Sequence, residues 1–269
     1  TDRQITDSVF LPSHSHNNWK VTTINGEQFF VRVYLHNPLG LSHRNELKCL
    51  LKAARRGIAP EPLFYCSEPA VLVSRYLPDA LHFSYQSARG SELAIILAEL
   101  HQCGVKVPVL NGLTYLEQLL AASVEPALVD LVLFEQLVNV VKLHSGLPQD
   151  IVVCHRDLTP ENILLSAEQL YLIDFEYVCL ADASFDLATI SFHHQLSEMA
   201  EQQWLEFYCS ARKLSGSELP QLHTKVKLAK VIYCGWCWLW YLMQPDFAEH
   251  TALWQQKLQS LLSDLPADI

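Results

Sequence analysis

The sequence predicts an α+β fold in which an N-terminal β-sheet with one helix precedes a larger, mainly helical part. Two observations lead to this prediction. The chain before Pro78 consists of β-prone runs separated by turn residues, and the chain after it mostly has the apolar spacing of helices. Half of the 269 residues are hydrophobic, so the chain can bury a substantial core.

A β-hairpin is predicted near the N-terminus. Residues 19–24 and 28–34 are rich in β-branched and aromatic side chains, and Asn25-Gly26 lies between them. This dipeptide readily adopts the positive φ values of a tight hairpin turn. We therefore expect these two runs to form antiparallel strands.

One helix and one further strand complete the predicted N-terminal part. Residues 42–56 place leucines on one helical face, and Gly57 follows as a C-terminal stop. Residues 70–76, AVLVSRY, are apolar enough to form a buried strand. The turn-forming pair Pro78-Asp79 then ends this part of the chain.

The rest of the chain is predicted to be helical except for residues 151–180. There, two short apolar runs flank a polar loop, which indicates short strands. We place the boundary between the two parts near residues 77–80, which gives domains of residues 1–78 and 79–269. The predicted helices cover residues 91–103, 113–122, 126–145, 198–213, 217–244 and 249–264.

The formal net charge of −10 argues against nucleic acid and anionic membranes as partners and favours cationic ligands. The longest apolar run, residues 231–243, is too short to span a bilayer. Eight scattered cysteines indicate a reducing compartment, and the first residues lack the features of a secretory signal. We therefore expect a cytoplasmic protein, and the sequence carries no signal for its oligomeric state.

The strongest motif is HRDLTPEN at residues 155–162, which is followed by IDFE with Asp174 as its acidic centre. Either fragment alone could be a solvated turn or a strand end. Together they resemble the catalytic loop and the metal-binding segment of the protein-kinase-like superfamily. The resemblance implies that Asp157 orients and deprotonates an acceptor hydroxyl and that His155 braces the loop. Asn162 and Asp174 then supply the hard oxygen ligands that Mg²⁺ requires.

The residues after Asp174 indicate which branch of the superfamily the chain resembles. A protein kinase would have glycine after Asp-Phe and a long activation segment ending in A-P-E, and both are missing. Instead, IDFEY is followed closely by FDLA, which contains Asp186. This arrangement resembles the aminoglycoside phosphotransferase and choline kinase family, particularly its choline and thiamine kinases. It implies a two-lobed kinase-like fold and a role for Asp186 in holding the catalytic loop, with a helix N-cap or a surface position as the alternative.

The resemblance extends to a basic strand residue and an acidic helix residue in the N-terminal part. Arg32 occupies the position where the family has a lysine that reaches the ATP phosphates, and Glu46 is its expected acidic partner. Arginine can replace lysine here, because its guanidinium binds phosphate and pairs with a carboxylate through two parallel hydrogen bonds. An exposed arginine and a solvated glutamate are the alternatives.

The predicted phosphate-covering loop, residues 11–18, departs from the family because it contains no glycine. Its polar side chains, Ser13, Ser15 and Asn17, take the place of the backbone N–H groups that glycines expose. A plain polar hairpin loop is the alternative. Ser74 and Tyr76 fall where the family's hinge contacts adenine. ATP and Mg²⁺ are therefore the expected cofactors.

An aromatic helix and two acidic residues are the candidates for substrate binding. Trp236 and Trp240 are four residues apart and so share a helical face, and tryptophan rings bind quaternary ammonium or thiazolium cations well. Packing in the helical core is the alternative. Glu176 and Asp182, near the metal-binding segment, are further groups that would attract a cation. The C-x-x-C spacing within this helix lacks the preceding strand of a redox site.

Taken with the resemblance, these residues predict an ATP- and magnesium-dependent phosphotransferase that acts on the hydroxyl of a small cationic metabolite. Choline or a related amino alcohol is placed ahead of thiamine, and an aminoglycoside comes third. The competing hypothesis is a non-catalytic ligand-binding protein of the same fold, which the glycine-free loop favours. The joint presence of Asp157, Asn162 and Asp174 argues against it.

Overall fold

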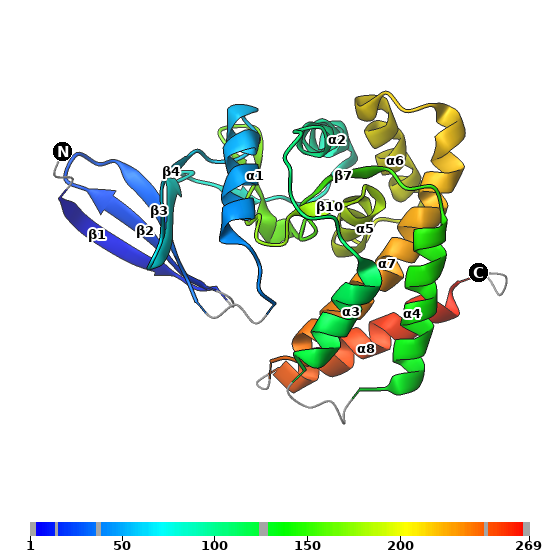
Figure 1. Ribbon diagram of the computed structural model, residues 1–269. Coiled ribbons are helices and arrows are strands. Elements are labelled where there is room, and N and C mark those ends of the chain that lie inside the picture. Colours follow the sequence, from blue (N-terminus) through cyan, green and yellow to red (C-terminus); the bar gives the residue numbers. More distant parts are fainter. Residues whose placement is uncertain (1–3, 14–15, 36–38, 124–128, 245–246, 266–269) are drawn as a thin grey trace.

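A computed structural model describes residues 4–13, 16–35, 39–123, 129–244 and 247–265. It confirms the predicted α+β architecture. An antiparallel sheet lies at one end of the molecule, α1 lies beside it, and the remaining helices form the larger part (Figure 1).

The N-terminal sheet has five antiparallel strands in the order β1-β2-β3-β5-β4. Gly26 has a φ of 76° between β2 and β3, as the predicted hairpin turn requires. β2 begins at His16, earlier than predicted, because its polar residues obscure the strand pattern; β4 was not predicted. The strands are β1 (Ile5–Leu11), β2 (His16–Thr23), β3 (Gln28–Tyr34), β4 (Pro62–Ser67) and β5 (Ala70–Arg75).

Helix α1 (His43–Arg55) packs beside this sheet with the ends that the sequence predicts. The side chain of Ser42 accepts a hydrogen bond from the backbone N–H of Asn45 and thereby caps the helix. Gly57 follows the helix at a φ of 73°. The buried face of α1 includes Glu46, which is 2% exposed. The helix therefore directs one carboxylate toward the protein interior.

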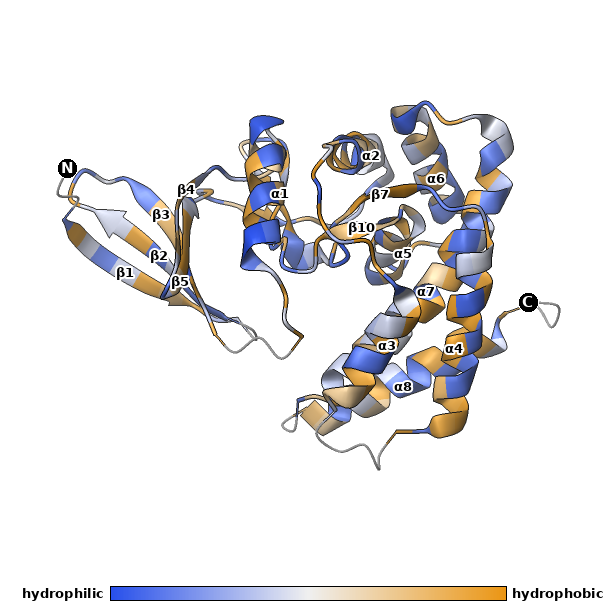
Figure 2. Cartoon of the chain, viewed as in Figure 1, coloured by the Kyte–Doolittle hydropathy of each residue, from blue (hydrophilic) through white to orange (hydrophobic). Residues whose placement is uncertain are grey.

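Two small sheets support the polar loop at residues 155–162, as predicted. β7 (Ile151–Cys154) pairs with β10 (Cys179–Asp182), and β8 (Ile163–Ser166) lies between two further strands. β7 is uniformly hydrophobic (Figure 2) and buried apart from its first residue. The loop is therefore anchored at both ends by strands. The two further strands are β6 (Leu81–His82) and β9 (Gln169–Leu172).

The helices after residue 80 follow the prediction with one addition, α5. Residues 184–191 of α5 are all buried, so the helix lacks the polar face that would have revealed its period. The helices are α2 (Ser87–His101), α3 (Gly112–Ala121), α4 (Leu131–Gly146), α5 (Ser184–His193), α6 (Glu198–Arg212), α7 (Leu219–Tyr241) and α8 (Ala248–Ser263).

We propose that the boundary between the two parts lies at residues 77–80. β5 ends at Arg75, and β6 pairs with β8 of the larger part, so the connection falls between them. Within the described ranges, no helix combines the length and apolarity needed to cross a membrane. All eight cysteines are free.

Replacement of Gly235 by alanine should destabilise the packing of α7 on α4. A Cβ atom at Gly235 would lie 2.6 Å from Leu137 Cδ1 and 3.0 Å from Leu137 Cγ, and Leu137 is fully buried. Overpacking of this kind typically costs about 1–3 kcal/mol. We therefore expect Gly235→Ala to lower the free energy of unfolding measured by urea denaturation.

Gly146→Ala is the matched control, because a Cβ atom at this α4 position meets nothing within 4 Å. The control should be neutral or slightly stabilising, since alanine has the higher helix propensity. Equal stabilities of the two variants would contradict the predicted clash.

Candidate active site

The polar loop between β7 and β8 brings Asp157 and Asn162 together. The Asn162 side-chain amide donates hydrogen bonds to Asp157 Oδ2 at 2.7 Å and to the Asp157 backbone oxygen at 2.9 Å. Burial raises the pKa of Asp157 to about 8, with further contributions from the carboxylates of Asp174 and Glu176. The side-chain N–H groups of Asn162 point toward Asp157. The side-chain oxygen of Asn162 is therefore available to bind a further ligand.

Asp186 fixes the start of this loop. Its carboxylate accepts hydrogen bonds from the backbone N–H groups of His155 at 2.8 Å and Arg156 at 2.7 Å. Arg156 has a φ of 69°, a conformation that a non-glycine residue keeps only when the surroundings enforce it. The two hydrogen bonds to Asp186 thus offset the strain of the turn at Arg156. This turn directs the next residue, Asp157.

His155 connects the loop to the segment that carries Asp174. His155 Nε2 lies 2.8 Å from the backbone oxygen of Ile173, and its ring packs against Phe175 with centroids 4.7 Å apart. These contacts join the loop to the two residues on either side of Asp174. The position of His155 is therefore that of a brace.

Asp174 forms a two-pronged ion pair with Arg32 of the N-terminal sheet. Arg32 Nη1 and Nη2 donate to Asp174 Oδ1 at 2.6 Å and Oδ2 at 2.9 Å. Burial opposes the charge of Asp174, but the Arg32 guanidinium holds the pKa of this carboxyl below its usual value. Arg32 also contacts Glu46 Oε1 at a longer distance of 3.4 Å. The pair therefore joins the sheet to the metal-binding segment.

A second contact between the two parts joins His16 to Glu176. His16 Nε2 lies 3.0 Å from Glu176 Oε2, and His16 is 5% exposed. In the β2–β3 register, His16 lies opposite Tyr34 and Asn18 lies opposite Arg32. Asn18 Oδ1 accepts a hydrogen bond from Arg32 Nε at 3.3 Å. His16 and Asn18 belong to the predicted phosphate loop, but we did not predict these contacts from the sequence; the alternation of the two residues along β2 was the available signal.

The other predicted nucleotide contacts are less closely grouped. Ser13 is exposed and Asn17 is half-buried on β2, while Ser15 lies outside the described residues. Because β2 begins at His16, the predicted loop over residues 11–18 is in large part strand. Ser74 is buried on β5, and Tyr76 follows that strand.

Asp182 and Trp236 are buried in the protein core, where other residues of the chain pair with them. Asp182 is 1% exposed and accepts a hydrogen bond from Lys225 Nζ at 2.7 Å, so its charge is already paired. Trp236 stacks on Arg156, with the guanidinium carbon 4.4 Å from the ring centroid, and Tyr115 covers the same guanidinium at 4.3 Å. The cation bound by Trp236 is therefore the protein's own arginine.

Trp240 is half-buried and packs edge-on against Tyr241, with ring centroids 5.0 Å apart. Asp157 also has tyrosines in its surroundings, among them Tyr177 and Tyr233. Burial raises the pKa of both tyrosines well above the usual value, and the charge of Asp157 contributes in each case. The sequence could have indicated Tyr177, because it directly follows Glu176.

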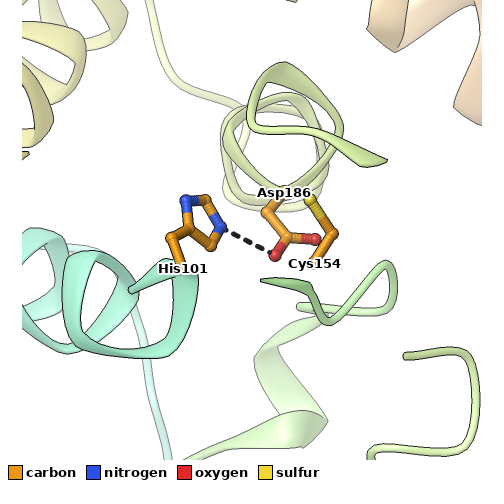
Figure 3. Close-up of side chains that lie close together, drawn as sticks. All are labelled: His101, Cys154 and Asp186. Carbon is orange, nitrogen blue, oxygen red and sulfur yellow. Dashed lines mark hydrogen bonds and ion pairs between the residues drawn. The ribbon is translucent and has the colours of Figure 1, made fainter. Parts of the chain in front are cut away.

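A buried trio of His101, Cys154 and Asp186 has the donor types of a metal site (Figure 3). Its atoms are already engaged, however. His101 Nε2 lies 3.1 Å from Asp186 Oδ2, and His101 Nδ1 lies 2.6 Å from the Tyr208 hydroxyl. Burial raises the pKa of the Cys154 thiol well above its usual value, which disfavours the thiolate that a metal requires. The trio therefore supports the loop, and its donor atoms are not available to a metal.

Asn162 and Asp174, by contrast, have the chemistry of a magnesium site. An amide oxygen and a carboxylate are hard donors, which Mg²⁺ prefers. Asp174 has a φ of 65°, a strained conformation of the kind found at functional sites. Asn162 and Asp174 therefore fit a bound Mg²⁺. In this structure Arg32 is the partner of one of them, Asp174.

We expect Asp186→Asn to destabilise the protein strongly. The change removes the charge that pairs with two backbone N–H groups and His101, and it places an amide N–H₂ group against those donors. Breaking a buried charge network typically costs about 3–5 kcal/mol. Urea denaturation followed by tryptophan fluorescence measures the loss. Asp264→Asn, at an exposed position after α8, is the control and should leave the midpoint unchanged; equal midpoints for both variants would refute this role of Asp186.

Comparisons with known proteins indicate the family and the fold of the chain. A family model described as the phosphotransferase enzyme family matches residues 8–220. The chain is 35% identical over 105 residues to the protein LicA of Haemophilus influenzae, a match that covers 38% of this chain and only 31% of that protein's length.

Solved structures show the same fold. Choline kinase LicA from Streptococcus pneumoniae superposes with a TM-score of 0.86 at 19% identity, covering 97% of this chain and 95% of that one. A structure of LicA in complex with AMP gives a TM-score of 0.83 at 20% identity, covering 98% and 93% of the two chains. Since the family model spans most of the chain, including Arg32, Asp157, Asn162, Asp174 and Asp186, this protein belongs to the phosphotransferase enzyme family.

Proposed function

We propose that this protein transfers the γ-phosphoryl group of ATP to the hydroxyl group of a small cationic alcohol, with choline as the first candidate. The observation that carries the proposal is the pairing of Asp157 with Asn162 at 2.7 Å, beside the ion pair of Arg32 and Asp174. This set supplies a carboxylate for the acceptor, hard ligands for a metal and a cation for the phosphates.

Asp157 is the group that receives the acceptor hydroxyl. It is held from one side by the Asn162 amide, and the backbone before it is fixed by Asp186. A fixed carboxylate can accept the hydroxyl proton while the oxygen attacks the phosphorus atom in line with the leaving group. The products are a phosphomonoester and ADP.

Asn162 and Asp174 would hold Mg²⁺, which when bound neutralises negative charge on the ATP phosphates. Arg32 contributes a second, fixed positive charge for the α- and β-phosphates. Ser74 and Tyr76, at the end of β5, remain our candidates for contacts with the adenine. The complex of the relative LicA with AMP supports nucleotide binding by this fold.

The surroundings of Asp157 favour a cationic acceptor. Asp174, Glu176 and Glu161 all contribute to raising the pKa of Asp157; Asp174 and Glu176 are paired with Arg32 and His16, and Glu161 is exposed. Tyr177 is also near Asp157 and offers an aromatic face for a quaternary ammonium group. A concentration of negative charge and an aromatic ring suit a permanent cation better than a neutral alcohol.

Choline stands ahead of the other acceptors because the similar structures include a choline kinase. Thiamine presents the same combination of hydroxyl and permanent charge, and an aminoglycoside, with several ammonium groups, would call for more acidic residues than we identify near Asp157. The glycine-free phosphate loop is the feature that favours a non-catalytic binding protein instead. The eight free cysteines support a cytoplasmic setting for the reaction.

The test is ADP release from ATP and Mg²⁺ with choline, ethanolamine, thiamine, homoserine or an aminoglycoside as the acceptor. We expect release that depends on choline or a related amino alcohol. ADP release with thiamine alone would identify thiamine as the acceptor. Absence of ATP binding would favour the non-catalytic hypothesis.

Asp157→Asn should abolish turnover while ATP binding is retained. The amide cannot take the hydroxyl proton, and loss of an acid–base group typically costs about 10²–10⁴ in rate. ADP release and nucleotide titration measure the two properties separately. Turnover at the wild-type rate would exclude Asp157 as the base.

Tyr177→Leu should raise the KM for choline about two- to thirtyfold, because a cation–π contact contributes roughly 0.5–2 kcal/mol. The KM for ATP should stay unchanged. The uncharged analogue 3,3-dimethylbutan-1-ol tests the physical cause, since its KM should be insensitive to the same change. Tyr171→Leu, on β9, is the control variant. If the change raised the KM for choline and for the neutral analogue equally, Tyr177 would recognise the shape of the acceptor and not its charge.

A further inference from the structure

We propose that Arg32 occupies the metal ligand Asp174 in the nucleotide-free protein, so that a divalent cation binds only when nucleotide phosphates draw Arg32 away. The inference rests on the proposed function, because it assigns Asp174 to metal and Arg32 to phosphate. It adds an order of binding: the cation enters together with the nucleotide.

The distances show which partner Arg32 prefers without nucleotide. Its two terminal nitrogens lie 2.6 and 2.9 Å from the two oxygens of Asp174, whereas the contact of Nη1 with Glu46 Oε1 is 3.4 Å long. Both oxygens of the proposed metal ligand are therefore engaged. Charge-assisted, two-pronged pairs of this geometry are among the strongest hydrogen-bonded contacts.

Glu46 indicates a second position for the same side chain. Glu46 is 2% exposed, and within the described part of the chain its Oε2 atom has no hydrogen-bond partner. An unpaired buried carboxylate oxygen is unfavourable. Because Arg32 is the cation already in contact with Glu46, movement of the guanidinium away from Asp174 would satisfy this oxygen.

A divalent cation and the Arg32 guanidinium compete for one carboxylate. Two positive groups at Asp174 repel each other, and Mg²⁺ needs near-octahedral access to the oxygens that Arg32 now covers. Nucleotide phosphates remove the conflict, because they offer the guanidinium new oxygens and offer the metal further ligands. Nucleotide binding therefore exposes Asp174 to the metal.

Arginine at position 32 is essential to this arrangement. Its planar fork covers both oxygens of Asp174 while Nε reaches Asn18. A lysine ammonium is a single point of charge, so it cannot reproduce these contacts together. Arg32→Lys should therefore keep a cation for the phosphates but release Asp174 for metal binding.

The experiment measures Mn²⁺ binding by the paramagnetic resonance signal of the free ion, with the intact protein and no acceptor. Without nucleotide, Arg32→Lys should bind Mn²⁺ at least about tenfold more tightly than the wild type, as expected for loss of a charge-assisted pair. A non-hydrolysable ATP analogue should raise the wild-type affinity, and AMP, which lacks the outer phosphates, should not. Arg75→Lys, at an exposed arginine of the same sheet paired with Glu61, is the control and should match the wild type.

Equal nucleotide-free affinities for the wild type and Arg32→Lys would overturn the proposal. Glu46→Gln provides a second variant, because removal of the Glu46 charge leaves Arg32 more firmly on Asp174. That variant should show a smaller nucleotide-induced gain in Mn²⁺ affinity, and an increased nucleotide-free affinity would contradict the inference. If the ATP analogue does not bind to the wild type at all, the proposed function fails, and the nucleotide-free comparison still decides whether Arg32 blocks the metal ligand.

Discussion

The position of Asp157 depends on one buried carboxylate, that of Asp186. Two backbone N–H groups at the start of the loop donate to it, and His101 of α2 supplies a third contact. A buried charge is tolerated only when such partners surround it. The turn at Arg156, which would otherwise be strained, is thereby fixed. Helices α2 and α5, which carry His101 and Asp186, therefore determine where Asp157 lies.

The two parts of the chain meet at their charged residues. Arg32 and His16 reach from the sheet to Asp174 and Glu176, which belong to one short segment of the larger part. Any ligand that takes one of these partners therefore changes the contact between the sheet and the helices. If Arg32 and Asp174 bind nucleotide and metal as we propose, both binding events would alter this contact between the two parts.

The sequence predicted the fold and the polar loop at residues 155–162, because these depend on local motifs and on periodicity. It could not predict the buried partners of Trp236 and Asp182. Helical periodicity put Trp236 and Trp240 on one face, but which face of α7 meets Asp157 depends on the packing of several helices. Trp236 instead pairs with Arg156, and Asp182 pairs with Lys225. Such pairings join residues distant in the sequence, and no local pattern reveals them.

We propose that Asp157 directs a hydroxyl of a cationic alcohol to the γ-phosphorus atom of ATP. ³¹P NMR of a reaction that contains the protein, ATP, Mg²⁺ and choline tests this proposal. We expect a new phosphomonoester resonance that grows in step with ADP and is absent without the acceptor. Formation of inorganic phosphate alone, at a rate unaffected by choline, would contradict it.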